Sequence, residues 1–93
     1  MDEPMKCVVK RAGHTEIYDE RKLYASVYAA MRAVREPAGT AELVAKEVES
    51  KVQNWLEHKH EVTSNDLRRV AAEHLRNINP GAAFIYKHHR VVW

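Results

Sequence analysis

The apolar positions of this chain follow two different periods, and the change of period separates predicted strands from predicted helices. Lys6–Arg11 is a short extended stretch with two central valines, and His14–Tyr18 is a second one. Ala12 and Gly13 form a turn between them, because glycine adopts positive φ without steric cost. After a flexible leader over residues 1–5, the sequence therefore predicts an N-terminal β-hairpin.

Two helices are predicted after the hairpin. Asp19 is a suitable N-cap for the first, because its carboxylate can accept hydrogen bonds from amides of the first turn. Arg35–Gly39, which contains Pro37, interrupts this helix, and Thr40 is the predicted N-cap of the next. The apolar positions at helical spacing are Leu23, Val27, Ala30, Met31 and Val34, then Val44, Val48, Val52 and Trp55.

Two more helices are predicted in the last third of the chain. Thr63 followed by Asp66 resembles a capping box. Asn79-Pro80-Gly81 ends the helix that begins there, and Pro80 starts a fourth helix that runs to His89. The third helix has the cleanest apolar stripe in the chain, formed by Leu67, Val70, Ala71, His74, Leu75 and Ile78.

The predicted order is two strands followed by four helices, and Glu61-Val62 adds an extended piece suited to the edge of a small sheet. An isolated hairpin is marginally stable in water, and each helix must bury its apolar stripe. The expected fold class is therefore α+β. An N-terminal β-hairpin forms a small sheet that caps a four-helix bundle, in a single domain over residues 6–93.

Composition excludes several classes of protein. A chain of 93 residues allows one core but not a pocketed two-domain enzyme, and its net charge of +2 does not by itself predict nucleic-acid binding. The single cysteine, Cys7, excludes an internal disulfide and a cysteine-based zinc site within one chain. No apolar run reaches the roughly 20 residues of a membrane span, and no signal peptide precedes the first strand, so we expect a cytoplasmic protein.

Catalytic and metal-binding patterns are weak. Neither His58-x-His60 nor His88-His89 has the i,i+4 spacing of a helical ligand pair. The serines lack the glycines of a nucleophile elbow, and Cys7 has no histidine at motif spacing. We therefore predict no catalytic residue and no metal ligand.

Basic residues near a helix start suggest a phosphate site. Lys10 and Arg11 end the first strand, and Lys22 lies in the first turn of a helix, where its charge opposes the helix dipole. A bound anion would remove this conflict, because helix N-termini offer unpaired amides. Lys10 and Arg11 have an alternative role as charges that prevent edge-to-edge strand pairing.

Carboxylates flank the same helix start. A carboxylate can accept hydrogen bonds from sugar hydroxyls or from the exocyclic amine of a purine. The cap role explains Asp19, so Glu16 is the better ligand candidate.

A second candidate group lies in the last two helices. Thr63 is first of all a cap, and Arg68, which follows Leu67 and so flanks the buried face, could point toward the ligand from its pair with Arg69. Lys87 and Arg90 share one helical face, which suits either an anion or a solvated basic helix end.

Taken in order, these residues resemble the ATP-cone domain, which occurs at the N-terminus of many ribonucleotide reductases and in the bacterial repressor of their operons. The resemblance covers about residues 6–91, and Ala12 stands where the family often has aspartate. The matching pieces are Val8-Val9-Lys10-Arg11-x-Gly13, Glu16, Asp19, Lys22-Leu23, Val62-Thr63-Ser64 and Ala83-Phe84-Ile85-Tyr86-Lys87-x-x-Arg90.

The resemblance implies a non-catalytic regulatory domain that binds ATP or dATP between hairpin and helices, with Mg²⁺ carried by the triphosphate. It implies action through nucleotide-dependent homo-oligomerisation or docking to a regulated protein such as ribonucleotide reductase. Since the chain has neither a reductase barrel nor a zinc ribbon, association is the expected means of regulation. The implied nucleotide-binding residues are Val9, Lys10, Arg11, Glu16, Tyr18, Asp19, Lys22, Leu23, Thr63, Arg68, Lys87 and Arg90.

Two alternatives need no nucleotide. The third helix carries Arg68, Arg69 and Arg76 after a turn, as a DNA-recognition helix would, although Glu73 lies among them. A plain protein-interaction bundle would use Trp55 and Trp93 as contacts. A salt-dependent gel shift without nucleotide would favour the first, and a stable protein complex without nucleotide binding would favour the second.

Overall fold

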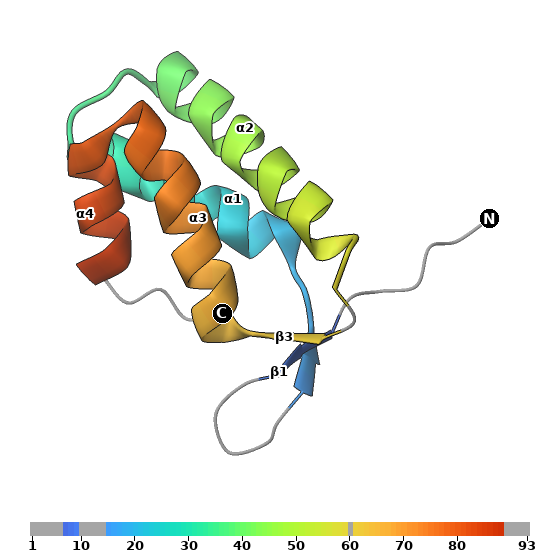
Figure 1. Ribbon diagram of the computed structural model, residues 1–93. Coiled ribbons are helices and arrows are strands. Elements are labelled where there is room, and N and C mark those ends of the chain that lie inside the picture. Colours follow the sequence, from blue (N-terminus) through green and yellow to red (C-terminus); the bar gives the residue numbers. More distant parts are fainter. Residues whose placement is uncertain (1–6, 10–14, 60, 89–93) are drawn as a thin grey trace.

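The computed structural model describes residues 7–9, 15–59 and 61–88, so the predicted leader lies outside the described residues. Figure 1 shows the helices gathered in one body, with the strands at its lower end. In chain order the elements are β1 (Cys7–Val9), β2 (Thr15–Ile17), α1 (Glu20–Ala33), α2 (Ala38–Leu56), β3 (Glu61–Thr63), α3 (Ser64–Ile78) and α4 (Pro80–His88).

Local signals place most helix starts where the sequence predicts them. The Asp19 carboxylate accepts a hydrogen bond from the amide of Arg21, which confirms the cap of α1. α4 begins at Pro80, as predicted. The predicted cap of α2 was wrong: the helix begins at Ala38 and Thr40 lies inside it. Pro37 is the N-cap, with an extended backbone at φ −60° and ψ 153° and no side-chain cap hydrogen bond.

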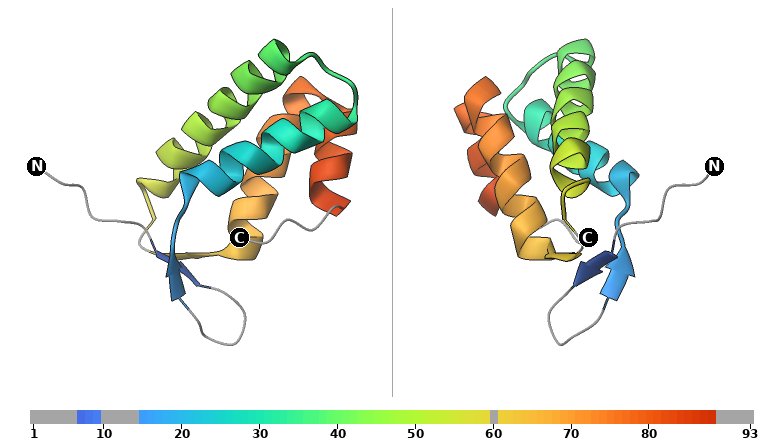
Figure 2. Two further views of the ribbon diagram at one scale, coloured as in Figure 1. Left: turned by 180° about the vertical axis from the view of Figure 1, so that it is seen from behind. Right: turned by 45° about the vertical axis from the view of Figure 1, so that its right-hand side comes forward.

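The helices bury one continuous core. α1 packs against α2 and α4, and α3 packs against α2 and α4, an arrangement that the two views of Figure 2 show. The predicted stripes are confirmed except at His74 and at their C-terminal ends, where Val34 is only half-buried. Leu56 is buried in place of the half-buried Trp55, and Ile78 is 38% exposed at the last position of α3.

The strands form a small sheet of order β2-β1-β3. β1 pairs antiparallel to β2, with Val8 opposite Glu16, and parallel to β3, with Val8 opposite Val62. Parallel pairing needs a long crossover, which α1 and α2 provide here. β3 therefore joins the β1–β2 pair from a distant part of the chain, so the sheet is not confined to the N-terminal strands.

The expected α+β fold class was wrong, because the strands make up only a small part of the described chain. Each strand has only three residues, whereas the four helices have 14, 19, 15 and 9. The described chain is a predominantly helical domain and not an α+β domain in which an N-terminal hairpin caps a bundle. Among the described residues, no helix is both long and apolar enough to cross a membrane.

Candidate functional site

The parallel pairing of β1 and β3 brings two predicted site residues together. Val9, the last residue of β1, lies opposite Thr63, which directly precedes α3. The C-terminal end of β1 therefore lies at the N-terminus of α3. Of Glu16 the structure gives the backbone position, opposite Val8.

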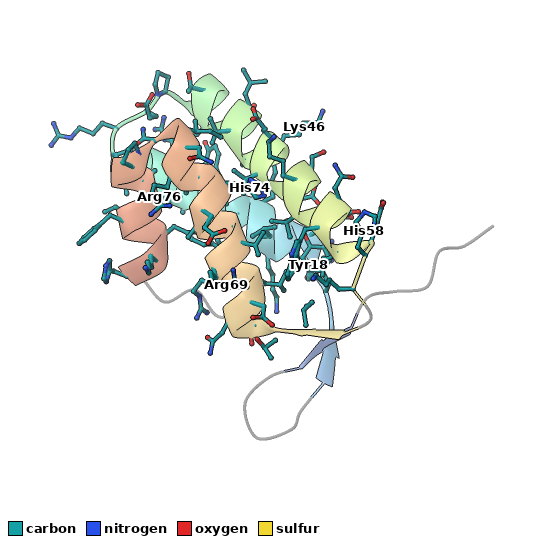
Figure 3. All side chains as sticks on the ribbon, in the orientation of Figure 1. Tyr18, Lys46, His58, Arg69, His74 and Arg76 are labelled. Atoms are coloured by element: carbon teal, nitrogen blue, oxygen red, sulfur yellow. The ribbon has the colours of Figure 1, made fainter. Side chains whose placement is uncertain are left out.

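Three predicted ligand residues, Lys10, Arg11 and Arg90, lie outside the described residues. Among the labelled residues of Figure 3, Tyr18 lies near the start of α1, and Arg69 and Arg76 lie along α3.

Thr63 and Asp66 form the predicted capping box, which the structure confirms. The Thr63 hydroxyl accepts from the amide of Asp66 at 3.0 Å, and the Asp66 carboxylate accepts from the amide of Thr63 at 3.3 Å. The hydrogen bond from the Thr63 amide holds the pKa of Asp66 below its ordinary value. The other amides of the first turn of α3 have no partner within the helix, so this end remains a suitable site for an anion.

Replacing Asp66 by asparagine is expected to reduce the free energy of unfolding at pH 7 by about 0.5–1 kcal/mol, because a charge-assisted hydrogen bond is lost. A lowered pKa stabilises the folded protein above the unfolded-state pKa of about 4, and this contribution is lost as the pH falls through the folded-state value. The difference between the two proteins should therefore disappear in acid. Denaturant titrations at pH 7, 5 and 2.5 measure it, and a pH-independent difference would contradict this role of the carboxylate.

The start of α1 carries a second group of predicted site residues. The Asp19 carboxylate caps the helix and lies 3.6 Å from Nε of Arg21. Lys22 is exposed in the first turn. Leu23 has 0% exposure and belongs to the hydrophobic core. The structure thus presents Lys22 to solvent beside the cap, with Leu23 directly behind it.

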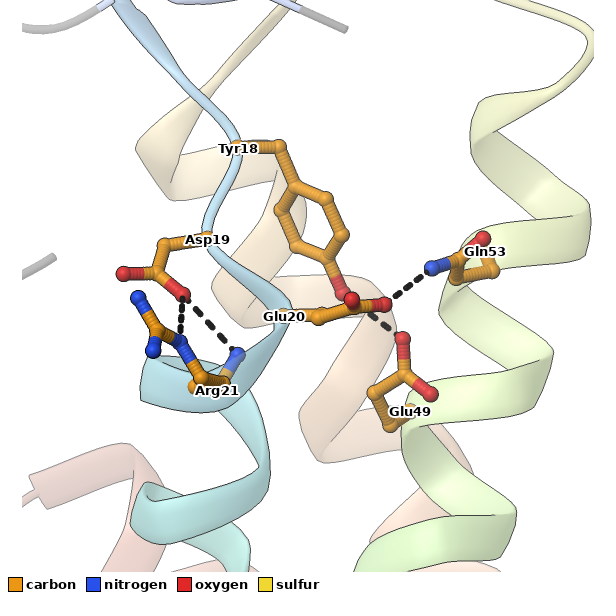
Figure 4. A network of polar contacts seen from close by, with 6 residues as sticks. All are labelled: Tyr18, Asp19, Glu20, Arg21, Glu49 and Gln53. Carbon is orange, nitrogen blue, oxygen red and sulfur yellow. Dashed lines mark hydrogen bonds and ion pairs between the residues drawn. The ribbon is translucent and has the colours of Figure 1, made fainter. Parts of the chain in front are cut away.

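Tyr18 joins α1 to α2 through a network that the sequence did not predict (Figure 4). Its hydroxyl donates to Glu49 at 3.5 Å, and Gln53 donates to Glu20 at 2.6 Å. Burial raises the pKa of Tyr18, and desolvation raises the pKa of Glu49. The only sequence signal for Glu49 and Gln53 is that each follows a buried valine of α2 and that they are one helical turn apart.

A groove of about 650 Å³ lies between the outer faces of α3 and α4, and it brings Arg68 and Lys87 together. Arg69 also lines it but is paired with Asp66 at 3.6 Å and Glu73 at 3.7 Å, whereas Arg68 is half-buried. The groove residues are Asn65, Arg68, Arg69, Ala72, Glu73 and Arg76 of α3 and Pro80, Ala83, Phe84, Lys87 and His88 of α4.

Tyr86 is buried beside this group, with 2% exposure. Burial raises the pKa of its hydroxyl, and the charge of Arg68 opposes that shift. Within the described part of the chain, the hydroxyl has no hydrogen-bond partner.

Replacing Tyr86 by phenylalanine is expected to increase the free energy of unfolding by about 1 kcal/mol, because it removes a buried polar atom that lacks a partner. Thermal or denaturant unfolding of the nucleotide-free protein measures this. A loss of stability in the phenylalanine variant would show instead that the hydroxyl makes a favourable hydrogen bond.

Metal coordination has no support in the described residues, where no three His, Cys, Asp or Glu side chains lie close enough to hold an ion.

A comparison with curated proteins gave no match. The family model described as the ATP cone domain matches residues 6–91, a range that contains every predicted site residue. This domain is a regulatory, nucleotide-binding domain. By this match over nearly its whole length, the chain belongs to the ATP-cone family.

Proposed function

We propose that the nucleotide is ATP or dATP, bound where β1 ends and where α1 and α3 begin, and that binding has a regulatory and not a catalytic consequence. The observation that carries the proposal is the pairing of Val9 with Thr63, which joins the end of a strand to a helix N-terminus. A helix N-terminus favours phosphate through its open amides and its positive dipole end. Lys10 and Arg11, which follow Val9 in the sequence, are proposed to contact the phosphates.

The other predicted residues divide into two roles. Glu16 and Asp19 would accept hydrogen bonds from the adenine amine or the sugar hydroxyls. Tyr18 and Val9 would pack near the base, and Leu23 would support it from the core. Phosphate contacts are proposed for Lys22, Thr63, Arg68, Lys87 and Arg90. Of the two adjacent arginines, the half-buried Arg68 is proposed for the phosphate role, and the exposed Arg69 is held in ion pairs with Asp66 and Glu73.

The magnitudes are sufficient for this ligand. Micromolar affinity requires about 8 kcal/mol. A charge-assisted hydrogen bond contributes about 1.5–3 kcal/mol. Four such contacts, from Lys10, Arg11, Lys22 and Lys87, together with packing of the base are therefore enough to exceed the cost of association. Mg²⁺ would enter with the triphosphate and keep most of its water, so it needs no carboxylate cage of the protein.

Regulation requires that the nucleotide bind one state of the protein more tightly than another. We propose that the states differ in association, either between copies of this chain or with a regulated protein such as ribonucleotide reductase. The groove residues Arg68 and Lys87 are shared between the proposed phosphate site and an outer surface of the molecule, which supports a link between binding and association.

The identity of the ligand is tested by denaturing the purified protein and separating the released small molecules by chromatography. The proposal predicts adenine nucleotides, or, if the site is empty after purification, binding of added ATP or dATP in equilibrium dialysis. The absence of both would contradict it. A gel shift on duplex DNA without nucleotide, reduced by salt, would instead support the alternative in which the arginines of α3 contact DNA.

A further inference from the structure

The α3–α4 groove has an apolar floor. Ala72 of α3 and Ala83 of α4 line it, and Phe84 projects into solvent with 63% exposure. The Phe84 ring contacts the His88 ring, with their centroids 4.2 Å apart. The floor thus offers a contact surface for an apolar side chain of a partner.

The two ends of the groove are basic. Arg76 and Pro80 lie where α3 turns into α4, and Lys87 and His88 lie at the far end of α4. Within the described ranges, Arg76 and Lys87 are exposed and neither has an ion-pair partner, whereas Glu73, the one acid that lines the groove, is paired with Arg69. The groove therefore carries unneutralised positive charge on both sides of an apolar centre.

The length of the groove suits two helical turns. From Arg68 to Arg76, α3 advances eight residues, which corresponds to about 12 Å at 1.5 Å per residue. A helix laid in such a groove presents side chains four residues apart at about 6 Å intervals. An apolar residue with acids one turn before and after it would match the floor and both basic ends.

We propose that this groove docks an acidic amphipathic helix of a partner protein, which places an apolar side chain against Phe84 and carboxylates near Arg76 and Lys87. Charge complementarity supports this occupant. The docking proposal rests on the proposed function in one respect: Arg68 and Lys87 line the groove and are also proposed to contact the nucleotide phosphates. The nucleotide and the partner helix would therefore influence each other's binding.

The surfaces of this chain itself fit the groove less well. Leu43 of α2 is the most exposed large apolar side chain among the described residues, at 71%. Lys46 and Glu47 both lie one turn beyond it, so a like charge accompanies the only matching carboxylate on that side. Gly39 and Thr40 lie one turn before it and offer no carboxylate to the other basic end. A nucleic-acid strand would place successive phosphates along the whole groove, including its apolar centre at Ala72 and Ala83. A second copy and a nucleic acid are therefore disfavoured occupants.

The test uses a fluorescein-labelled helical peptide of 18 residues, with one leucine flanked by glutamate four residues before and after it in an alanine–glutamine background. Fluorescence anisotropy with the intact chain is expected to show saturable binding that weakens several-fold between 50 and 300 mM NaCl. Arg76→Glu is expected to weaken binding by about tenfold and Phe84→Ala by about fivefold. Lys46→Glu, which makes the same charge change on α2 (Figure 3), is the control and should change affinity less than about twofold.

The variants also separate this proposal from nucleotide binding. Arg76 and Phe84 lie outside the proposed nucleotide contacts, so both variants should bind ATP as the wild type does and retain its circular dichroism. Unchanged peptide affinity in both variants, or equal affinity for a peptide with lysine in place of glutamate, would overturn the docking proposal while leaving nucleotide binding intact. Two other results would also overturn it: tighter binding of a 12-nucleotide oligothymidylate at these residues, or self-association that Phe84→Ala abolishes. Peptide binding without any ATP binding would overturn the proposed function alone.

Discussion

Replacing Lys22 with alanine is expected to weaken ATP binding at least tenfold and to leave the thermal midpoint of the nucleotide-free protein nearly unchanged. The side chain is exposed in the first turn of α1, and among the described residues it makes no ion pair whose loss would affect folding. A tenfold change corresponds to about 1.4 kcal/mol, which is close to the contribution of one charge-assisted hydrogen bond. Isothermal titration calorimetry measures the affinity of both proteins.

Lys46→Ala is the matched control for this experiment. Lys46 is also an exposed helical lysine, but it lies on α2 and outside the predicted site. Its removal should alter ATP affinity less than about twofold, as expected for a distant surface charge. Equal affinities of the Lys22→Ala variant and the wild type would remove Lys22 from the site.

Replacing Leu23 with alanine is expected to give a large loss of stability, about 2–5 kcal/mol. The side chain is completely buried between the helices, so truncation removes apolar contacts and leaves a cavity. A domain of this size has a total stability of about 5–15 kcal/mol, so the variant should be much easier to unfold. Denaturant titration followed by circular dichroism gives the free energy of unfolding.

Leu43→Ala makes the same chemical change on the surface, since Leu43 is 71% exposed on α2. Its effect should stay within about 0.5 kcal/mol. If both leucine variants lost the same small amount of stability, Leu23 would not have the core position described here, and its predicted role near the base would be the simpler explanation for a leucine at this point.

The helices were largely predictable because their signals are local. The Asp19 cap, the capping box of Thr63 and Asp66, and Pro80 at the start of α4 each depend on residues within one turn of one another. Thr40 was the exception, since the helix begins at Ala38, directly after Pro37, although Pro37 makes no side-chain cap hydrogen bond. Competition between two adjacent start signals is decided by packing, which the sequence pattern does not contain.

The sequence predicted an extended piece at Glu61-Val62, where β3 lies at the edge of the sheet, but not the partner of that strand. Its pairing of Val8 with Val62 joins residues on either side of α1 and α2, and the periodicity of a three-residue strand is too short to specify such a partner. Contacts between elements that are distant in the sequence also decide the candidate site. The sequence identified Arg68 and Lys87 separately, but only the packing of α4 on α3 brings them to one groove. Glu49 and Gln53 were not predicted, because no sequence motif includes them. Their partners, Tyr18 and Glu20, lie at the start of α1, on the other side of the α1–α2 turn.

Calorimetric titration of the magnesium complexes of ATP and dATP into the intact chain decides whether this domain binds an adenine nucleotide. Saturable binding at micromolar concentration is expected, because several cations and a helix N-terminus act on the same polyphosphate. No heat of binding and no change in thermal midpoint at 5 mM of either nucleotide would contradict it.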